Sequence, residues 1–309
     1  MDNKVQISTL AEYVTVITEI ISKLEKPNLL NEYKLYFRGI ENIGFELIPS
    51  IARHPSQFVC NSLTWYEERF VHEAKRKLPD VFKDEEYPIN LLTRLQHYGI
   101  PTRLLDITSN ALVALYFACL NEMNEDGEVI VFSAGIENMH PYTSPIANAI
   151  SESYLFSKLT FSKLDGLISE AESHSYFNRF RQQEVEPDRS KYIELLASRF
   201  KEPIFIMPLE LSERQKRQQG AFILFPNKIE LNTRFEPNEY EILEGIEKMN
   251  KDTDSRIAKR IVIQNTHKSL IIRELSSFGI SEDFLFPDSV DVVCKSIANN
   301  IKGLYKQNY

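Results

Sequence analysis

Cysteine is scarce in this 309-residue sequence. The three cysteines, Cys60, Cys119 and Cys294, lie far apart and are odd in number. Such spacing predicts neither a disulfide framework nor a zinc site. Cys119 falls in an apolar segment, where a buried and unreactive thiol is expected. No two of the six histidines have the spacing of metal ligands, so no metal is expected either.

Long apolar runs and a targeting signal are also missing. The longest apolar stretch, residues 111–120, is about half as long as the ~20 residues that cross a bilayer. Residues 1–20 lack the basic region, apolar run and small-residue cleavage site of a secretory signal. We therefore expect no membrane segment, and a reducing cytoplasm as the compartment.

Positive charge is not in excess. The sequence has 36 lysines and arginines against 44 aspartates and glutamates, a formal net charge of -8. Broad, non-specific nucleic-acid binding depends on neutralising phosphates, so we do not expect it here. No glycine-rich phosphate loop follows a predicted strand, and no serine lies in a nucleophile-elbow pattern. Clustered carboxylates of the kind a nuclease or another hydrolase uses are missing as well.

What is present is the composition of a globular protein, with 43% hydrophobic and 26% charged residues. Periodicity and turn signals predict a mixed α+β protein. Helices are expected at residues 8–25, 61–78, 91–98, 110–121, 238–250, 268–278 and 288–307. Strands are expected at residues 33–39, 128–132, 204–208, 221–225 and 260–264.

The chain is predicted to be one unit over residues 1–309, because it contains no repeat, low-complexity linker or sharp change in charge. Its core sheet is expected from residues 30–135 and 200–235. The polar segment 136–200 is interpreted as a helical insertion that partly covers the core. Residues 236–309 are expected to form a C-terminal helical segment.

The first candidate site residue is Arg38, at the end of an apolar strand and before Gly39. A strand holds the arginine at a fixed angle, and the glycine lets backbone or ligand approach closely. Such an arginine suits bidentate binding of a phosphate or carboxylate. The alternative is a strand-end arginine that pairs with an acidic neighbour.

The second candidate is the polar segment 96–108, which leads into the apolar helix expected at 110–121. Its hydrogen-bonding groups lie close to the core and therefore need partners. Either they satisfy one another or they converge on a ligand, and Asp106 paired with Arg103 or Arg38 is the structural alternative. The polar side chains concerned are Gln96, His97, Thr102, Arg103, Asp106 and Thr108.

The third candidate is the turn 218–222, where Gln218 and Gln219 enter a predicted strand. A glutamine amide offers both a donor and an acceptor for recognising a base or an amide. The alternative is a β-turn whose glutamines face solvent.

Several of these segments together resemble the FRG domain. The resemblance rests on residues 36–39, 47–53, 96–108, 114–118, 219–222 and 275–288, and it covers residues 30–300 with an interruption at 135–200. The central part, from Gln96 to Asp106 and on to Ala118, is long and specific. The tripeptide Phe37-Arg38-Gly39 alone would not be.

A second resemblance is more distant. A strand that ends aromatic-Arg-Gly, a later strand with hydroxyl residues, and a helix of the Ala-x-x-Phe-Ala kind are similar to the arginine-serine-glutamate class of ADP-ribosyltransferases. This resemblance implies a mixed, mostly antiparallel sheet flanked by helices, and NAD as the cofactor. It implies that Arg38 holds an NAD phosphate or ribose, and that Asp106 and Thr108 lie in the hydroxyl-bearing strand. The catalytic residues so implied are Arg38, His97, Asp106 and Gln219, and the NAD-binding residues are Arg38, Gly39, Gln96, Thr102, Arg103, Thr108 and Phe222.

The sequence departs from that class at one position. Gln218 and Gln219 stand where the class carries a glutamate. A neutral amide can bind a ribose hydroxyl, but it cannot stabilise a developing oxocarbenium ion by charge or act as a base. Either Asp106 takes over that role, or the protein binds a nucleotide without turning it over.

Two functions follow as hypotheses. The first is an NAD-dependent ADP-ribosyltransferase or NAD glycohydrolase, acting as a bacterial toxin or antiphage defence effector on a macromolecular acceptor or on water. The alternative is a non-catalytic recognition module whose neighbouring surface binds protein or nucleic acid, including a regulatory protein. An enzyme requires Arg38, His97 and Asp106 to converge in one open cleft, whereas the module predicts that they pair internally.

Overall fold

The structure is a computed structural model. It describes residues 3–24, 33–53, 63–82, 85–120, 124–135, 138–152, 158–159, 200–210, 212–232 and 239–287. Within these ranges no helix combines the length and the apolar character needed to span a bilayer.

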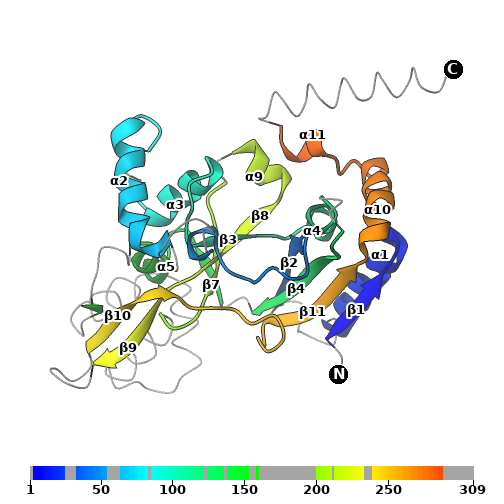
Figure 1. Cartoon of the computed structure of the whole chain (residues 1–309), viewed down its shortest axis with the longest axis horizontal. Helices are drawn as coiled ribbons and strands as arrows, with labels where there is room; N and C mark the ends of the chain where they lie inside the picture. Colours follow the sequence, from blue (N-terminus) through cyan, green and yellow to red (C-terminus); the bar gives the residue numbers. More distant parts are fainter. Residues whose placement is uncertain are drawn as a thin grey trace.

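An eight-stranded sheet forms the centre of the molecule (Figure 1). Its strand order is β1-β11-β4-β2-β3-β8-β7-β5, and only the outer pairs β1–β11 and β5–β7 are parallel. The sheet is therefore mixed and mostly antiparallel, as expected. The strands are β1 (Lys4–Ile7), β2 (Tyr33–Ile40), β3 (Leu104–Thr108), β4 (Gly127–Gly135), β5 (Met139–Pro141), β7 (Ile204–Met207), β8 (Gly220–Leu224) and β11 (Ile257–Ile263).

Helices cover one face of this sheet in two groups. The first group is α2 (Glu67–Lys77), α3 (Pro88–His97) and α5 (Pro145–Ser151), whose apolar side chains pack on β3, β7 and β8. The second group is α1 (Leu10–Leu24), α4 (Ala111–Ala118) and α10 (Asn265–Ser277), which pack on β1, β2, β4 and β11. In Figure 1 the two groups lie on the left and right sides of the molecule.

Side-chain caps mark the start of α1 and α4. The Thr9 hydroxyl accepts a hydrogen bond from the backbone N–H of Glu12 (3.2 Å) at the start of α1. The Asn110 side chain accepts from the N–H groups of Leu112 (3.0 Å) and Val113 (3.3 Å) at the start of α4. The helices expected near residues 8–25, 91–98, 110–121 and 268–278 are thus confirmed as α1, α3, α4 and α10.

The opposite face of the sheet is covered, within the described residues, by the chain after β2, which includes a short 3-10 helix (Ser50–Ala52), and by the chain before β11. Its core includes Tyr36, Leu105 and Phe132 from the strands, Leu47 from the chain after β2, and Met249 from the chain before β11. Both loop residues are almost fully buried, and a backbone bridge joins them.

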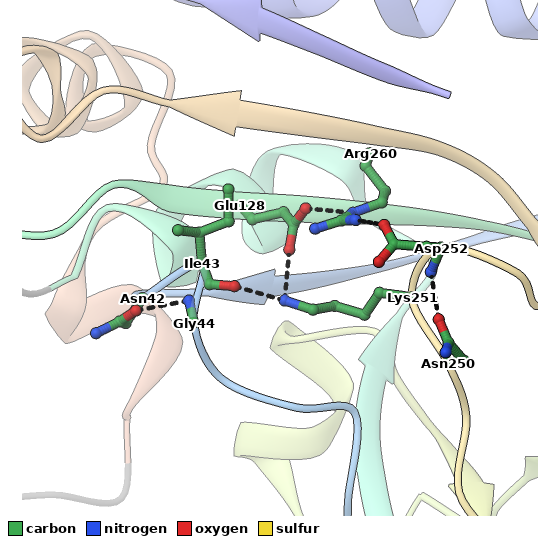
Figure 2. A network of polar contacts seen from close by, with 8 residues as sticks. All are labelled: Asn42, Ile43, Gly44, Glu128, Asn250, Lys251, Asp252 and Arg260. Carbon is green, nitrogen blue, oxygen red and sulfur yellow. Dashed lines mark hydrogen bonds and ion pairs between the residues drawn. The ribbon is translucent and has the colours of Figure 1, made fainter. Parts of the chain in front are cut away.

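A cluster of charged residues around the buried Glu128 ties these two loops to the sheet (Figure 2). We call Glu128, Lys251, Asp252 and Arg260 the Glu128 cluster. The fully buried Glu128 carboxylate accepts from Arg260 Nε (2.6 Å) and Lys251 Nζ (3.0 Å). Lys251 Nζ also donates to the carbonyl oxygen of Ile43 (2.7 Å), and Arg260 pairs with Asp252. Every member of the cluster therefore has a partner within the protein.

The helix predicted at residues 238–250 is wrong. β10 (Glu239–Ile246) lies there instead, in a small antiparallel sheet with β6 (Lys158–Leu159) and β9 (Asn227–Asn232). The strand pairing places Tyr240 opposite Leu231 and Ile242 opposite Ile229. Gly245 has φ 97°, a left-handed conformation that interrupts a helix. Cross-strand pairing has thus overridden the helix propensity of the glutamates and Leu243.

Two further expectations were the insertion at residues 136–200 and the helix at residues 288–307. The first part of the predicted insertion belongs to the core, because α5 buries Ile146 and Ile150, and β5 joins the large sheet. The rest of that segment, apart from β6 and Phe200, lies outside the described residues, as does the helix predicted at 288–307.

Candidate functional site

The large sheet is nearly divided between β2 and β3. β2 pairs with β4 over eight residues, from Tyr33 to Ile40, but it pairs with β3 at one position only, Phe37 opposite Thr108. Beyond that pair the ladder stops, and the Arg38 guanidinium donates a hydrogen bond to the backbone carbonyl of Asp106. A side chain thus bridges the two strands where a backbone ladder would otherwise continue.

The three residues of the Phe-Arg-Gly tripeptide have three different tasks. Phe37 is buried in the core under α4. A Cβ added at Gly39 would lie 1.9 Å from the Ala114 carbonyl oxygen and 2.6 Å from the Ala118 nitrogen, so only glycine lets α4 pack this closely on β2. Arg38, between them, faces the gap between the strands.

A cavity of about 260 Å³ lies at this gap. Its walls come from both halves of the sheet (β2 on one side, β3 and β8 on the other), from α3 and α4, and from the short helix α9 (Glu213–Arg217) with its flanking residues. In Figure 1, α9 lies between α3 and α4. The cavity is therefore the place where the two helical groups and the two halves of the sheet meet.

Most of the residues predicted from the sequence line this cavity. They are Arg38, Gly39, Gln96, His97, Asp106, Thr108 and Phe222. A cation, an imidazole, an amide and a carboxylate from β2, α3 and β3 thus share one hollow, although Arg38 is far from the others in sequence.

Arg38 is partly buried, and its charge is only partly compensated. Burial lowers the pKa of its guanidinium from the usual value to about 10, Asp106 opposes that shift, and Arg53 reinforces it. The group remains protonated at neutral pH. Only its bond to the Asp106 carbonyl is formed within the described residues, which leaves most of its five N–H donors available to a ligand.

Asp106 is the one carboxylate among the described residues that line the cavity. Its side chain is exposed and has no hydrogen-bond donor within the described part of the chain, whereas its backbone carbonyl accepts from Arg38. The carboxylate lies close enough to Arg38 to stabilise its charge. It is therefore available to a ligand hydroxyl or to a developing positive charge.

The Thr108 hydroxyl is occupied by the protein itself. It donates to the carbonyl oxygen of Gln218 (2.6 Å) and accepts from the backbone N–H of Asn110 (2.9 Å). The adjacent Ser109 N–H donates to the Gln219 carbonyl (3.1 Å). These bonds fix the end of β3 to the turn before β8, so Thr108 shapes the cavity wall through its position.

Thr102 and Arg103, predicted as NAD-binding, do not line the cavity. Arg103 is fully buried and forms a two-pronged ion pair with Glu67, with Nε 2.8 Å from Oε1. It also donates to Asn227 Oδ1 (2.9 Å) and to the Phe225 carbonyl (3.3 Å). Thr102 is buried and donates to the Gln96 side chain, which fixes that cavity residue in place.

Gln219, predicted as catalytic, does not line the cavity either. It is exposed and has φ 46°, which is uncommon for a residue with a side chain. Its neighbour Gln218 lines the cavity in its place.

The lining residues that sequence reasoning missed are Thr93, Phe117, Ser212, Arg214 and Gln215, whereas Gln218 belongs to the third candidate, the turn 218–222. Three of the missed residues, Ser212, Arg214 and Gln215, belong to α9 and its N-terminal end. The basic run at residues 214–217, next to the glutamine-glycine turn, was the available signal for this wall of the site.

Within the described residues no group of three or more histidine, cysteine or acidic side chains could hold a metal ion. Cys119 is buried, as expected, and burial raises the pKa of its thiol to about 12, so the thiol is unreactive at neutral pH.

Comparison with known proteins agrees with the resemblance seen in the motifs. Residues 33–127 match the family model of the FRG domain. No curated protein and no solved structure matches the chain. The matched region runs from β2 to the first residue of β4 and contains the β2–β3 gap, α3 and α4.

Proposed function

We propose that this FRG-domain protein binds a nucleotide of the NAD type in the cavity between β2 and β3. The observation that carries the proposal is the convergence of Arg38, His97 and Asp106 on one hollow. Internal pairing, which a purely structural role requires, accounts for Arg103 but not for the Asp106 carboxylate. Anionic and hydroxyl-bearing ligands match a guanidinium, an amide and a carboxylate that line one cavity.

The size of the cavity limits how much of such a ligand it encloses. Its volume of about 260 Å³ is just below the roughly 300–1,000 Å³ typical of pockets for drug-sized molecules. It therefore suits one nucleotide half of NAD together with a phosphate, with the remainder over the rim. Phe37, Phe117 and Phe222 supply apolar surface for a ring.

If the bound nucleotide is turned over, the reaction is displacement of nicotinamide from NAD. The bond between the ribose C1′ and the nicotinamide nitrogen breaks, neutral nicotinamide leaves, and water or a macromolecular nucleophile forms the new bond to C1′. We assign to Asp106 the stabilisation of the positive charge that develops on the ribose, because it is the carboxylate among the described residues that line the cavity.

Equilibrium titration with NAD and ADP-ribose tests the proposal. Wild-type protein is expected to bind both ligands. Arg38→Ala is expected to weaken binding at least about tenfold, because a hydrogen bond to a charged group contributes roughly 1.5–3 kcal/mol. Arg273→Ala is the matched control, since Arg273 is exposed and does not line the cavity, and the affinity of this variant is expected to stay within about twofold of the wild type.

Nicotinamide release measured on the same proteins separates catalysis from recognition. An enzyme predicts release by the wild type, and its loss in Asp106→Asn with NAD binding retained. A recognition module predicts binding without release in both proteins. Folded wild-type protein that binds neither NAD nor ADP-ribose would end the proposal.

A further inference from the structure

The helix α9, which forms one wall of the cavity, carries three cations with different surroundings. Lys216 pairs with Glu213 on the same helix (2.7 Å). Arg217 is exposed, donates to the carbonyl oxygen of Phe284 (3.2 Å) and does not line the cavity. Arg214 does line it, and it has no acidic partner among the described residues. Of the three, Arg214 is the cation directed to the site.

Arg214 is held by an aromatic ring rather than by a carboxylate. The centre of its guanidinium lies 4.6 Å from the centroid of the Phe286 ring. Stacking of this kind orients the guanidinium plane and leaves its N–H donors at the edge unoccupied. A cation fixed in this way keeps both its charge and its donors for an anion.

Phe286 lies outside the cavity lining and is itself held against α4. Its ring meets that of Phe117, a cavity residue on α4, edge to face with centroids 6.1 Å apart. The preceding helix α11 (Glu282–Leu285) is tied to α9, since Gln218 Nε2 donates to the carbonyl oxygen of Leu285 (3.2 Å). The chain around Phe286 thus fastens α9 to α4 and sets where Arg214 lies.

We infer that Arg214 is a second anion-binding residue of the cavity, positioned by Phe286, and that the site recognises a diphosphate shared between Arg38 and Arg214. This inference rests on the proposed function, and it narrows the ligand class to nucleotides with two adjacent phosphates. One guanidinium can neutralise a single phosphate. Two guanidiniums that line the same cavity match a diphosphate, as charge-assisted hydrogen bonds to each phosphate add to binding.

The experiment compares inorganic pyrophosphate, inorganic phosphate and NAD as probes for the full-length protein. Wild type is expected to bind pyrophosphate more tightly than phosphate. Arg214→Ala is expected to remove most of that preference and to weaken NAD binding roughly tenfold, while binding of phosphate, which needs Arg38 alone, changes little. Arg217→Ala is the matched control, because Arg217 lies on the same helix and stacks on Phe284 (5.3 Å) outside the cavity.

Variants of the two phenylalanines test the positioning role. Phe286→Leu is expected to reduce the preference for pyrophosphate, and Phe286→Tyr, which retains the stacked ring, to restore it; Phe284→Leu should leave it unchanged. A merely structural role for Phe286 would lower stability without altering the ratio of the two affinities. Wild-type binding of NAD with Arg214→Ala equal to wild type on all probes would overturn this inference alone. Absence of NAD binding by folded wild type would overturn the proposed function and this inference together.

Discussion

The Glu128 cluster and the cavity both contain carboxylates and cations, but these groups differ in how far they are paired within the protein. In the cluster, both oxygens of a fully buried carboxylate are occupied, one by Arg260 and one by Lys251. In the cavity, the Asp106 carboxylate is exposed, and Arg38 reaches only a backbone carbonyl. The cluster is closed, in the sense that its charged groups are paired within the protein, whereas the cavity is open, because Asp106 and Arg38 remain accessible to a ligand.

The difference shows which charged residues serve the fold and which are available to a ligand. A buried carboxylate with two cationic partners is costly to disturb, because removing one member leaves an uncompensated charge. A guanidinium that is desolvated but incompletely paired is kept at the expense of stability, which is typical of functional sites. Variants in the two regions should therefore affect different properties.

The largest effect on stability is expected from Glu128→Ala. The change leaves Arg260 and Lys251 without their buried partner and releases the loops that they hold (Figure 2). We expect the free energy of unfolding to fall by roughly 3–5 kcal/mol, as measured by urea denaturation. At a temperature at which the variant is still folded, its affinity for NAD should remain close to that of the wild type.

Glu46→Ala is the control for this variant. Glu46 also pairs with a lysine, Lys248 (3.8 Å), but both side chains are exposed. An exposed pair contributes about 0–1 kcal/mol, so this change should scarcely alter the unfolding curve. Equal losses in the two variants would contradict the view that burial and closure give the Glu128 cluster its role.

The next largest effect on stability is expected from Gly39→Ala, and it is compared with the same change at Gly220, because both glycines line the cavity. Gly39→Ala must displace backbone atoms of α4, whose nearest oxygen would lie 1.9 Å from the new Cβ. We expect a loss of about 3 kcal/mol in the free energy of unfolding, together with weaker nucleotide binding, because α4 carries Phe117. Calorimetry and ligand titration measure the two consequences.

Gly220→Ala is the matched change. Its Cβ would meet Gln215 Cγ at 3.5 Å, an ordinary contact. Stability should change by less than about 1 kcal/mol. A large loss at position 220, or none at position 39, would show that close approach of α4 is not the reason for glycine in the tripeptide.

The sequence was sufficient to predict the elements with strong periodicity and those with clear caps. The strand of residues 33–39, the helix after Asn110 and the apolar strand β4 are all present, and so is the antiparallel character of the sheet. The prediction for the region of β10 was wrong because glutamate and leucine favour a helix. The outcome is decided by pairing with β9, which is a tertiary interaction.

The site was predictable in part for a similar reason. The arginine at the end of a predicted strand and the polar segment 96–108 pointed to Arg38, His97 and Asp106, which do line one cavity. Arg103 lies in the same polar segment, yet its partner Glu67 is on α2 and cannot be inferred from local sequence. Likewise, nothing local distinguishes Arg214 from Arg217, because the distinction comes from which ring each stacks on.

The smallest effect on stability, and the clearest contrast with the closed regions, is expected from Arg38→Met. Burial lowers the pKa of Arg38 to about 10, so at neutral pH the folded state holds a proton that the unfolded state would bind more tightly. Its charge therefore disfavours folding at any pH below about 10, and this cost fades as the pH rises above that value. Methionine keeps the length and apolar stem without the charge. We expect the free energy of unfolding at pH 7 to be unchanged or raised by up to about 1 kcal/mol, while NAD binding is lost.

Arg103→Met is the matched arginine, because it removes a guanidinium of the same size that is fully buried against Glu67. Here the uncompensated Glu67 should lower the free energy of unfolding by roughly 3–5 kcal/mol. Denaturation and NAD titration of both variants compare their free energies of unfolding and their affinities for NAD directly. If Arg38→Met were as destabilising as Arg103→Met, Arg38 would belong with the closed, structural ion pairs, and the cavity would lose the cation on which its binding role depends.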